Sequence, residues 1–160
     1  MITKEYLQDR FEYRNGNFYR KFDSKSKPKK GDVVGSKNKG GYIETRLFNK
    51  QYKLHKLIWL YFYGYLPKYI DHINGVTYDN RIENLREANH SENMMNTKMR
   101  ITNKTGIKGV NWHKASNKWT VQLMVNQKKK YFGIYDDIEL AELVAIEARN
   151  KYHGEFARHN

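Results

Sequence analysis

The sequence predicts an α+β protein made of two small units that a short linker joins. Three observations predict this class. The stretch "KMRITNKTG" at 98–106 is polar and carries a glycine, as linkers do. Before it, short alternating segments precede helical patterns, and after it three strand-like segments precede a single helical pattern. We therefore expect domains at 1–100 and 106–160, with the linker at 101–105.

Composition limits the class of protein. The chain has 160 residues, of which 39% are hydrophobic and 14% aromatic, enough for two small cores. The longest apolar run, Leu57–Tyr65, is too short to cross a bilayer, and the N-terminus has no apolar signal-peptide core. No cysteine is present, which excludes disulfides and thiolate metal sites. We expect a soluble intracellular protein that does not act on a membrane.

Charge points to a polyanionic partner. The formal net charge is +13, and positive residues are segregated rather than scattered. Residues 14–56 hold 13 Lys and Arg against three acids, and residues 100–135 hold eight against none. Segregation of this kind builds positive faces, which most often bind nucleic acid.

In the first unit, a hairpin followed by a helix is predicted. Residues 42–48 alternate, with Ile43, Thr45 and Leu47 on one face. Asn49 and Lys50 can turn this strand into "QYKLHKL". A helix is expected over 54–64, ending at Gly64, with His55 near its start in a structural role.

The stretch "YIDHINGVTYDNRIENLR" at 69–86 predicts a strand end, a turn and a loop. Asp71 and His72 close the strand, and Asn-Gly at 74–75 is a strong turn signal. A helix should begin after Asn89, which with Glu92 forms a capping box, and should run from His90 to about Lys98. A unit this small would gain stability from a bound metal ion.

The polar residues of this stretch suit metal-dependent chemistry. Asp71 supplies a hard oxygen ligand for Mg²⁺ or Mn²⁺, and neutral His72 can take a proton from water. His90 and Asn93 are three residues apart on one helix face, so either can reach an ion. Asn84 can tie the intervening loop to the His72 strand.

The spacing D-H-x₁₁-N-x₈-N, with "LHKLIWLYFYG" upstream and "NLREANHSENMMN" downstream, resembles the HNH nucleases of ββα-metal fold over roughly residues 42–97. The resemblance implies that His72 is the general base, Asp71 a metal ligand and Asn84 a structural asparagine, which we group with His72 among the catalytic residues. It places the helix ligand on Asn93, with His90 as the alternative. One divalent metal ion, Mg²⁺ or Mn²⁺, is implied.

Beyond the linker, three strands and a helix are predicted. The strands are 109–114, 118–125 and 128–135, and a helix follows Asp136-Asp137 and ends at Gly154. We expect an apolar sheet face to pack on this helix, formed by Trp112, Val121, Leu123 and Phe132. The opposite face should be polar, free of acids and suited in width to the DNA major groove.

Residues 106–160, "GIKGVNWHKASNKWTVQL" to "HGEFARHN", also resemble the AP2 DNA-binding domain. Carried over by position, that family's groove-reading residues fall on the same polar face. They are Lys108, Asn111, His113, Gln122, Met124, Lys129 and Tyr131. In the first unit, Arg46 and Lys56 are candidate phosphate contacts.

Together these features predict an HNH endonuclease, similar to phage-borne homing endonucleases, that hydrolyses phosphodiester bonds in double-stranded DNA. A single site in a monomer predicts nicking of one strand, in the cytoplasm or nucleoid of a phage-infected host. The alternative is a non-catalytic, sequence-specific DNA-binding protein that keeps the fold, which the Asp71-His72 pair disfavours. An RNA-binding protein fits the charge but not this pair.

Overall fold

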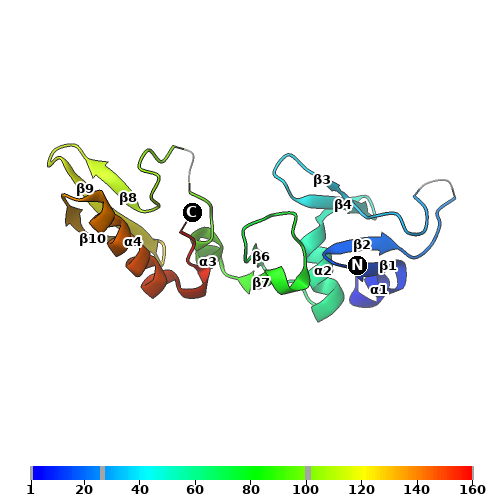
Figure 1. Cartoon of the computed structure of the whole chain (residues 1–160). Helices are drawn as coiled ribbons and strands as arrows, with labels where there is room; N and C mark the ends of the chain where they lie inside the picture. Colours follow the sequence, from blue (N-terminus) through cyan, green and yellow to red (C-terminus); the bar gives the residue numbers. More distant parts are fainter. Residues whose placement is uncertain (1, 26–27, 100–101, 160) are drawn as a thin grey trace. The chain divides into compact units, whose positions relative to one another are not determined.

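The computed structural model describes residues 2–25, 28–99 and 102–159, which form four α-helices and several small antiparallel sheets (Figure 1). They separate into two compact units, Met1–Ala88 and Asn89–Asn160. The α+β class agrees with this content. The helix that starts at His90 was expected in the first domain, and it packs within the second unit. The predicted domain boundaries, at 1–100, 101–105 and 106–160, remain a prediction. Among the described residues, no helix is long and apolar enough to span a membrane.

The first unit begins with elements that the sequence analysis did not predict. They are α1 (Lys4–Arg10), β1 (Phe11–Arg14) and β2 (Asn17–Arg20). Thr3 caps α1, and Asn15 and Gly16 take positive φ angles of 45° and 80° in the hairpin turn. Strands of four residues carry too little alternation to be recognised in the sequence.

A three-stranded antiparallel sheet follows in the order β3-β4-β5. Its strands are β3 (Ser36–Lys37), β4 (Ile43–Leu47) and β5 (Lys50–Lys53). The predicted hairpin is confirmed, and Thr45 and Leu47 are buried as expected. The turn lies at Phe48 and Asn49, whose φ angles are positive, one residue earlier than predicted.

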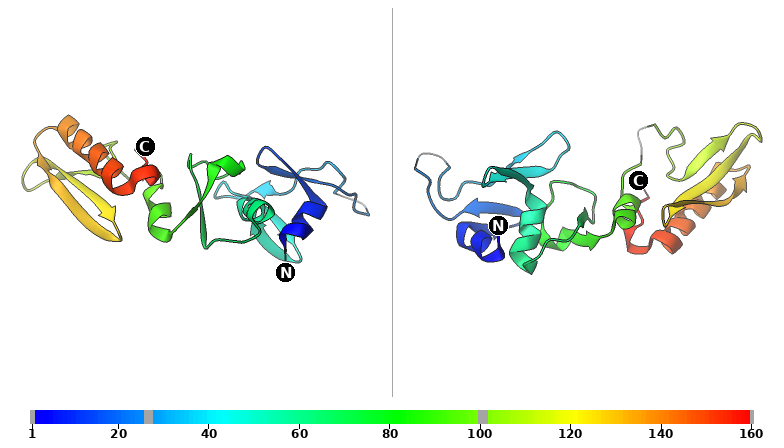
Figure 2. Two further views of the ribbon diagram at one scale, coloured as in Figure 1. Left: turned by 90° about the horizontal axis from the view of Figure 1, so that it is seen from below. Right: turned by 180° about the vertical axis from the view of Figure 1, so that it is seen from behind.

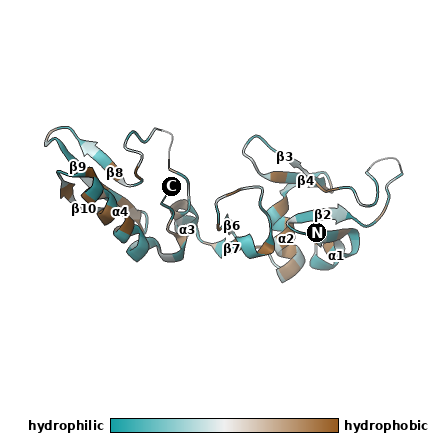
Figure 3. Cartoon of the chain, viewed as in Figure 1, coloured by the Kyte–Doolittle hydropathy of each residue, from teal (hydrophilic) through white to brown (hydrophobic). Residues whose placement is uncertain are grey.

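Helix α2 (Leu54–Tyr63) forms the centre of the first core. Leu54, Leu57 and Ile58 are fully buried in a cluster that also contains residues of α1 and the hairpin. Figure 3 shows hydrophobic residues concentrated on this helix. Gly64 ends it at φ 79°, a left-handed conformation that glycine adopts without strain, so the predicted end is confirmed.

The segment that carries Asp71 and His72 forms a further antiparallel strand pair. Strand β6 (Tyr69–His72) pairs with β7 (Leu85–Ala88), and a short 3₁₀ helix (Ile82–Asn84) precedes β7. His72 lies opposite Leu85 in this ladder. The predicted strand end and loop are therefore present, and residues 73–81 connect them.

The second unit opens with helix α3 (His90–Met95). The predicted capping box is present, with Asn89 and Glu92 each bonding the other's backbone. The helix ends at Met95 rather than near Lys98, because the chain leaves helical geometry after Asn96. None of its six residues is buried.

The remaining elements form a sheet covered by one helix, as Figure 2 shows from two sides. Strands β8 (Val110–His113), β9 (Lys118–Val125) and β10 (Lys128–Tyr135) pair in the order β10-β9-β8. Helix α4 (Ile138–His153) is capped by Asp137 and packs along β9 and β10. These four elements confirm the predicted ones.

The core of this unit is made of small side chains. Val110, Val121, Ala141 and Ala145 are fully buried between the sheet and α4. Trp112, predicted to be in this core, is 45% exposed and lies against the ring of Trp119 at 4.6 Å. Val110 occupies the core position on β8 that the prediction gave to Trp112.

Candidate active site

Three aromatic rings meet at the end of β6. The His72 ring lies 5.0 Å from that of His55 on α2, nearly perpendicular to it. The Tyr42 ring lies 5.6 Å from His55 and 6.0 Å from His72. Both histidines are buried, and the Lys53 ammonium lies 3.9 Å from the centre of the Tyr42 ring. This cluster encloses the imidazole that the sequence identified as the base.

A buried amide orients that imidazole. His72 Nε2 lies 3.0 Å from the side-chain oxygen Oδ1 of Asn80, which is 1% exposed. With the amide oxygen of Asn80 turned towards the ring, Nε2 donates and carries the proton, and Nδ1 holds the lone pair. The contact assigns the basic role to Nδ1. No role for Asn80 was predicted from the sequence, because the seven residues between His72 and Asn80 reveal no contact until the loop folds.

The protonation states follow from burial. Burial lowers the pKa of His72, and the hydrogen bond to Asn80 and the charge of Asp71 act in the opposite direction. His72 is therefore neutral at pH 7 and able to accept a proton. Burial, with His72, Lys53 and Lys56 adding to it, lowers the pKa of His55 to about 3, so His55 stays neutral as well.

Asp71 is a buried carboxylate held by an arginine. Both Nε and a terminal nitrogen of Arg86 lie within 2.9 Å of Asp71 Oδ2. Arg86 stands opposite Asp71 in the β6–β7 ladder. A buried charge of this kind is costly unless it is paired, and the guanidinium both pairs with the carboxylate and orients it.

Asn84 braces the loop between the two strands. Its amide nitrogen donates to the backbone oxygen of Asp79 at 2.7 Å and to Asn74 Oδ1 at 3.1 Å. Its oxygen accepts from the backbone nitrogen of Asn74 at 3.0 Å. These bonds close the turn that follows His72, so Asn84 fixes the conformation of the loop. Its grouping with His72 as a catalytic residue remains a prediction.

The two candidate helix ligands lie in the second unit. Asn93 is half-buried and His90 exposed, both on α3. Asp71 and His72 belong to the first unit, whereas Asn93 and His90 belong to the second. The assignments of Asn93 and His90 therefore remain predictions.

The donor chemistry fits a hard divalent cation. Within residues 2–25, 28–99 and 102–159, no three His, Cys, Asp or Glu side chains gather closely enough to hold a metal ion. Mg²⁺, however, retains several waters and needs only one or two protein oxygens. The Asp71 carboxylate with an amide oxygen or imidazole is such a donor set, and it leaves most coordination positions to water or phosphate.

Six of the predicted DNA-contacting residues share one sheet face. In the register, Tyr131 stands opposite Gln122 and Lys129 opposite Met124. On β8, alternation places Asn111 and His113 on the same side. Five of the six are exposed, and Gln122 is half-buried. The predicted face is present, and its DNA contacts remain a prediction.

Lys108 differs from these six residues. Its ammonium donates to the backbone oxygens of Met95 at 2.9 Å and Thr97 at 2.7 Å. Burial, with Arg149 and Arg158 adding to it, lowers the pKa of Lys108 to about 8. In the first unit, Arg46 is exposed on β4 and Lys56 is half-buried on α2, where their phosphate contacts remain predictions.

Comparison with known proteins gives two matches. Residues 52–95 match the HNH endonuclease family, a range that includes His55, Asp71, His72, Asn80 and Asn84. The chain is also 34% identical over 113 residues to "Protein 3.8" of Escherichia phage T7, covering 69% of this chain and 93% of that protein. No solved structure matches the chain.

Proposed function

The chain belongs to the family of protein 3.8 of Escherichia phage T7 and carries an HNH endonuclease domain, and from this premise we propose that it is a metal-dependent DNA endonuclease. It hydrolyses phosphodiester bonds in double-stranded DNA, as a homing-type enzyme that nicks one strand. The observation that carries the proposal is the buried, neutral His72, oriented by Asn80 beside the Asp71 carboxylate.

In the proposed mechanism, His72 Nδ1 takes a proton from a water molecule. The water oxygen forms a bond to phosphorus, and the bond between phosphorus and one ester oxygen breaks. Asn80 Oδ1 accepts a hydrogen bond from His72 Nε2–H, and this contact favours the imidazolium as it forms. Proton transfer of this kind contributes about 10²–10⁴-fold to the rate.

Asp71 and Asn93 would hold one Mg²⁺ or Mn²⁺, with His90 as the alternative to Asn93. The ion supplies stabilisation of the negative charge that develops on the phosphate and the leaving oxygen. Arg86 holds Asp71 Oδ2, which fixes the direction of the carboxylate before any ion binds. This arrangement limits the reorganisation needed for binding.

DNA recognition is assigned to the AP2-like sheet of the second unit. Its acid-free polar face presents Lys129 with neutral side chains that can contact base edges. A monomer with one nuclease site accounts for cleavage of one strand. The phage relative supports action inside an infected bacterial cell.

The test is plasmid nicking by the full chain in Mg²⁺ or Mn²⁺, with EDTA as a blank. Wild-type protein should relax supercoiled plasmid, whereas His72→Ala should lose about 10²-fold or more in rate and keep its affinity for DNA. His159→Ala, an exposed histidine near the C-terminus, is the matched control. DNA binding without metal-dependent nicking by the wild-type protein would favour the non-catalytic alternative.

A further inference from the structure

The helix that bears Asn93 is too short to be stable alone. α3 has six residues, and isolated helices shorter than about 12–15 residues are marginal in water. Helices this short are normally held by burying an apolar face, but none of the six residues is buried. Beside its contact with the 3₁₀ helix Gly154–Phe156, the helix therefore depends on interactions at its two ends.

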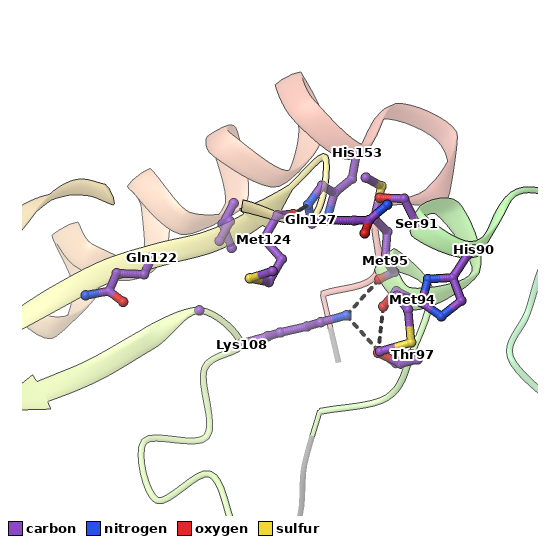
Figure 4. A pocket seen from close by; sticks show the side chains of 12 residues that line it. His90, Ser91, Met94, Met95, Thr97, Lys108, Gln122, Met124, Gln127 and His153 are labelled. Carbon is purple, nitrogen blue, oxygen red and sulfur yellow. Dashed lines mark hydrogen bonds between the residues drawn. The ribbon is translucent and has the colours of Figure 1, made fainter. Parts of the chain in front are cut away.

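Packing beneath the helix is loose. A cavity of about 440 Å³ lies between α3 and β9, lined on one side by Met94 and Met95 and on the other by Leu123 and Met124 (Figure 4). Methionine side chains adapt to irregular gaps but specify position poorly. Apolar contact thus contributes little to the position of α3.

Hydrogen bonds close both ends of the helix instead. The capping box at Asn89 satisfies the first amides. At the other end, the Thr97 hydroxyl donates to Met94 O at 2.7 Å, and the Lys108 ammonium reaches Met95 O and Thr97 O (Figure 4). A cation bonded to the last carbonyls also complements the helix dipole.

Lys108 is itself fixed to the body of the second unit. Its backbone oxygen accepts a hydrogen bond from Arg149, which is 1% exposed on α4. The next residue, Gly109, has φ 88°, and its oxygen accepts from the backbone nitrogen of Gln122 at 2.9 Å. A Cβ at Gly109 would come within 2.6 Å of Leu123 Cδ2, so this segment lies directly against β9. A rigid base therefore supports the Lys108 side chain.

We propose that Lys108 is a positioning residue that clamps the C-terminal end of α3, so that the second unit holds the helix carrying the candidate ligands Asn93 and His90. This role rests on the proposed function and replaces the predicted contact between Lys108 and DNA. The side chain directs its ammonium at two carbonyl oxygens of its own unit, which leaves fewer donors for a phosphate. The C-terminal unit then serves the nuclease site as well as recognition.

The experiment compares Lys108→Met with Lys129→Met in the full chain. Both variants lose one positive charge, and methionine retains much of the apolar stem. Amide hydrogen exchange of residues 89–97 is followed with β9 as the internal reference. We expect Lys108→Met to speed exchange of the Asn96 and Thr97 amides by about tenfold or more, with β9 unchanged. Lys129→Met should leave both segments as in the wild type.

Activity provides a separate readout. Lys108→Met should raise the Mg²⁺ concentration for half-maximal nicking by about tenfold and leave the salt dependence of DNA binding unchanged. Lys129→Met should lower the salt dependence of DNA binding and leave the Mg²⁺ concentration for half-maximal nicking unchanged. If wild-type protein never nicks DNA, the proposed function fails, while the exchange result still decides whether Lys108 clamps α3.

The proposal is overturned if α3 exchanges in Lys108→Met as it does in wild type, or if that variant lowers only the salt slope of binding. If Lys108→Met also speeds amide exchange in β9, Lys108→Gln replaces it as the test variant. Glutamine keeps a polar group at the cavity but is too short to reach both carbonyls. It is judged by the same exchange comparison.

Discussion

The candidate active site and the polar face of the C-terminal sheet hold their side chains in opposite environments. In the first unit, His55, Asp71, His72, Asn80 and Asn84 are all at most 7% exposed and are held by neighbouring side chains or backbone. In the second, the polar residues of the sheet face point outward. Burial fixes orientation and protonation, which proton transfer needs, whereas an exposed sheet face leaves donors available to a partner. Chemistry and recognition thus require different environments for the same residue types.

The strongest test of the buried site is the substitution Asn80→Leu. It removes the hydrogen-bond acceptor for His72 Nε2 while keeping the side-chain volume. The nicking rate should fall about 100-fold, since the imidazole loses its fixed tautomer. Binding of DNA should be unchanged. Long-range ¹H–¹⁵N spectra of labelled wild-type protein should show the Nε2–H tautomer of His72, and the Nδ1–H tautomer would contradict the assignment.

Asn80→Asp refines the same test. A carboxylate still accepts from Nε2, so activity should be partly kept. It also raises the pKa of His72, so a larger fraction of the base is protonated at a given pH. The pH of half-maximal rate should therefore rise above that of wild type. A purely structural asparagine would give no such shift.

The helix ligand is tested by Asn93→Ala and His90→Ala. If Asn93 holds the ion, its loss should raise the Mg²⁺ needed for half-maximal nicking by about 10-fold or more, and more than His90→Ala does. Titration of nicking rate against Mg²⁺ measures both. The reverse order transfers the ligand role to His90.

Burial of His55 predicts pH-dependent stability of the first unit. Its folded-state pKa of about 3 lies below the unfolded value near 6.5, so its stabilisation is complete above pH 6.5 and is lost as the pH falls towards 3. As the pH falls from 7.5 to 5, protonation of this histidine in the unfolded chain should lower the free energy of unfolding by about 2 kcal/mol. His55→Leu should remove most of that loss.

The measurement is urea unfolding in EDTA, followed by Trp59 fluorescence. The background carries Trp112→Phe and Trp119→Phe, which leaves Trp59 as the sole tryptophan. Parallel pH dependence of the His55→Leu protein and its parent would contradict the assignment of the effect to His55.

The smallest expected effect concerns the exposed sheet. If Lys129 contacts a phosphate, Lys129→Met should lower the slope of log K against log salt by about 0.9. Lys151→Met on α4, which covers the opposite face, should leave the slope unchanged. Equal slopes in the two variants would mean that the polar face is not the DNA-binding surface.

The sequence by itself determined the elements that have a local signature. Gly64 ended a helix, Asn89 and Glu92 began another, and alternation over eight residues defined β9. It also predicted roles for Asp71, His72 and Asn84, because their spacing resembles a known family, and these roles remain predictions. The α1 helix and the β1–β2 hairpin escaped notice, since their identity depends on burying Leu7, Phe11 and Phe18 in a distant core.

Only the tertiary structure decided which side chains meet. His72 contacts Asn80 across a folded loop, His55 reaches His72 from another element, and Lys108 turns towards α3 rather than outward. Trp112 likewise has the alternation of a core residue, yet it is 45% exposed on the edge strand β8. Periodicity reports the side of an element on which a residue lies. What that side faces depends on long-range packing, which no local pattern encodes.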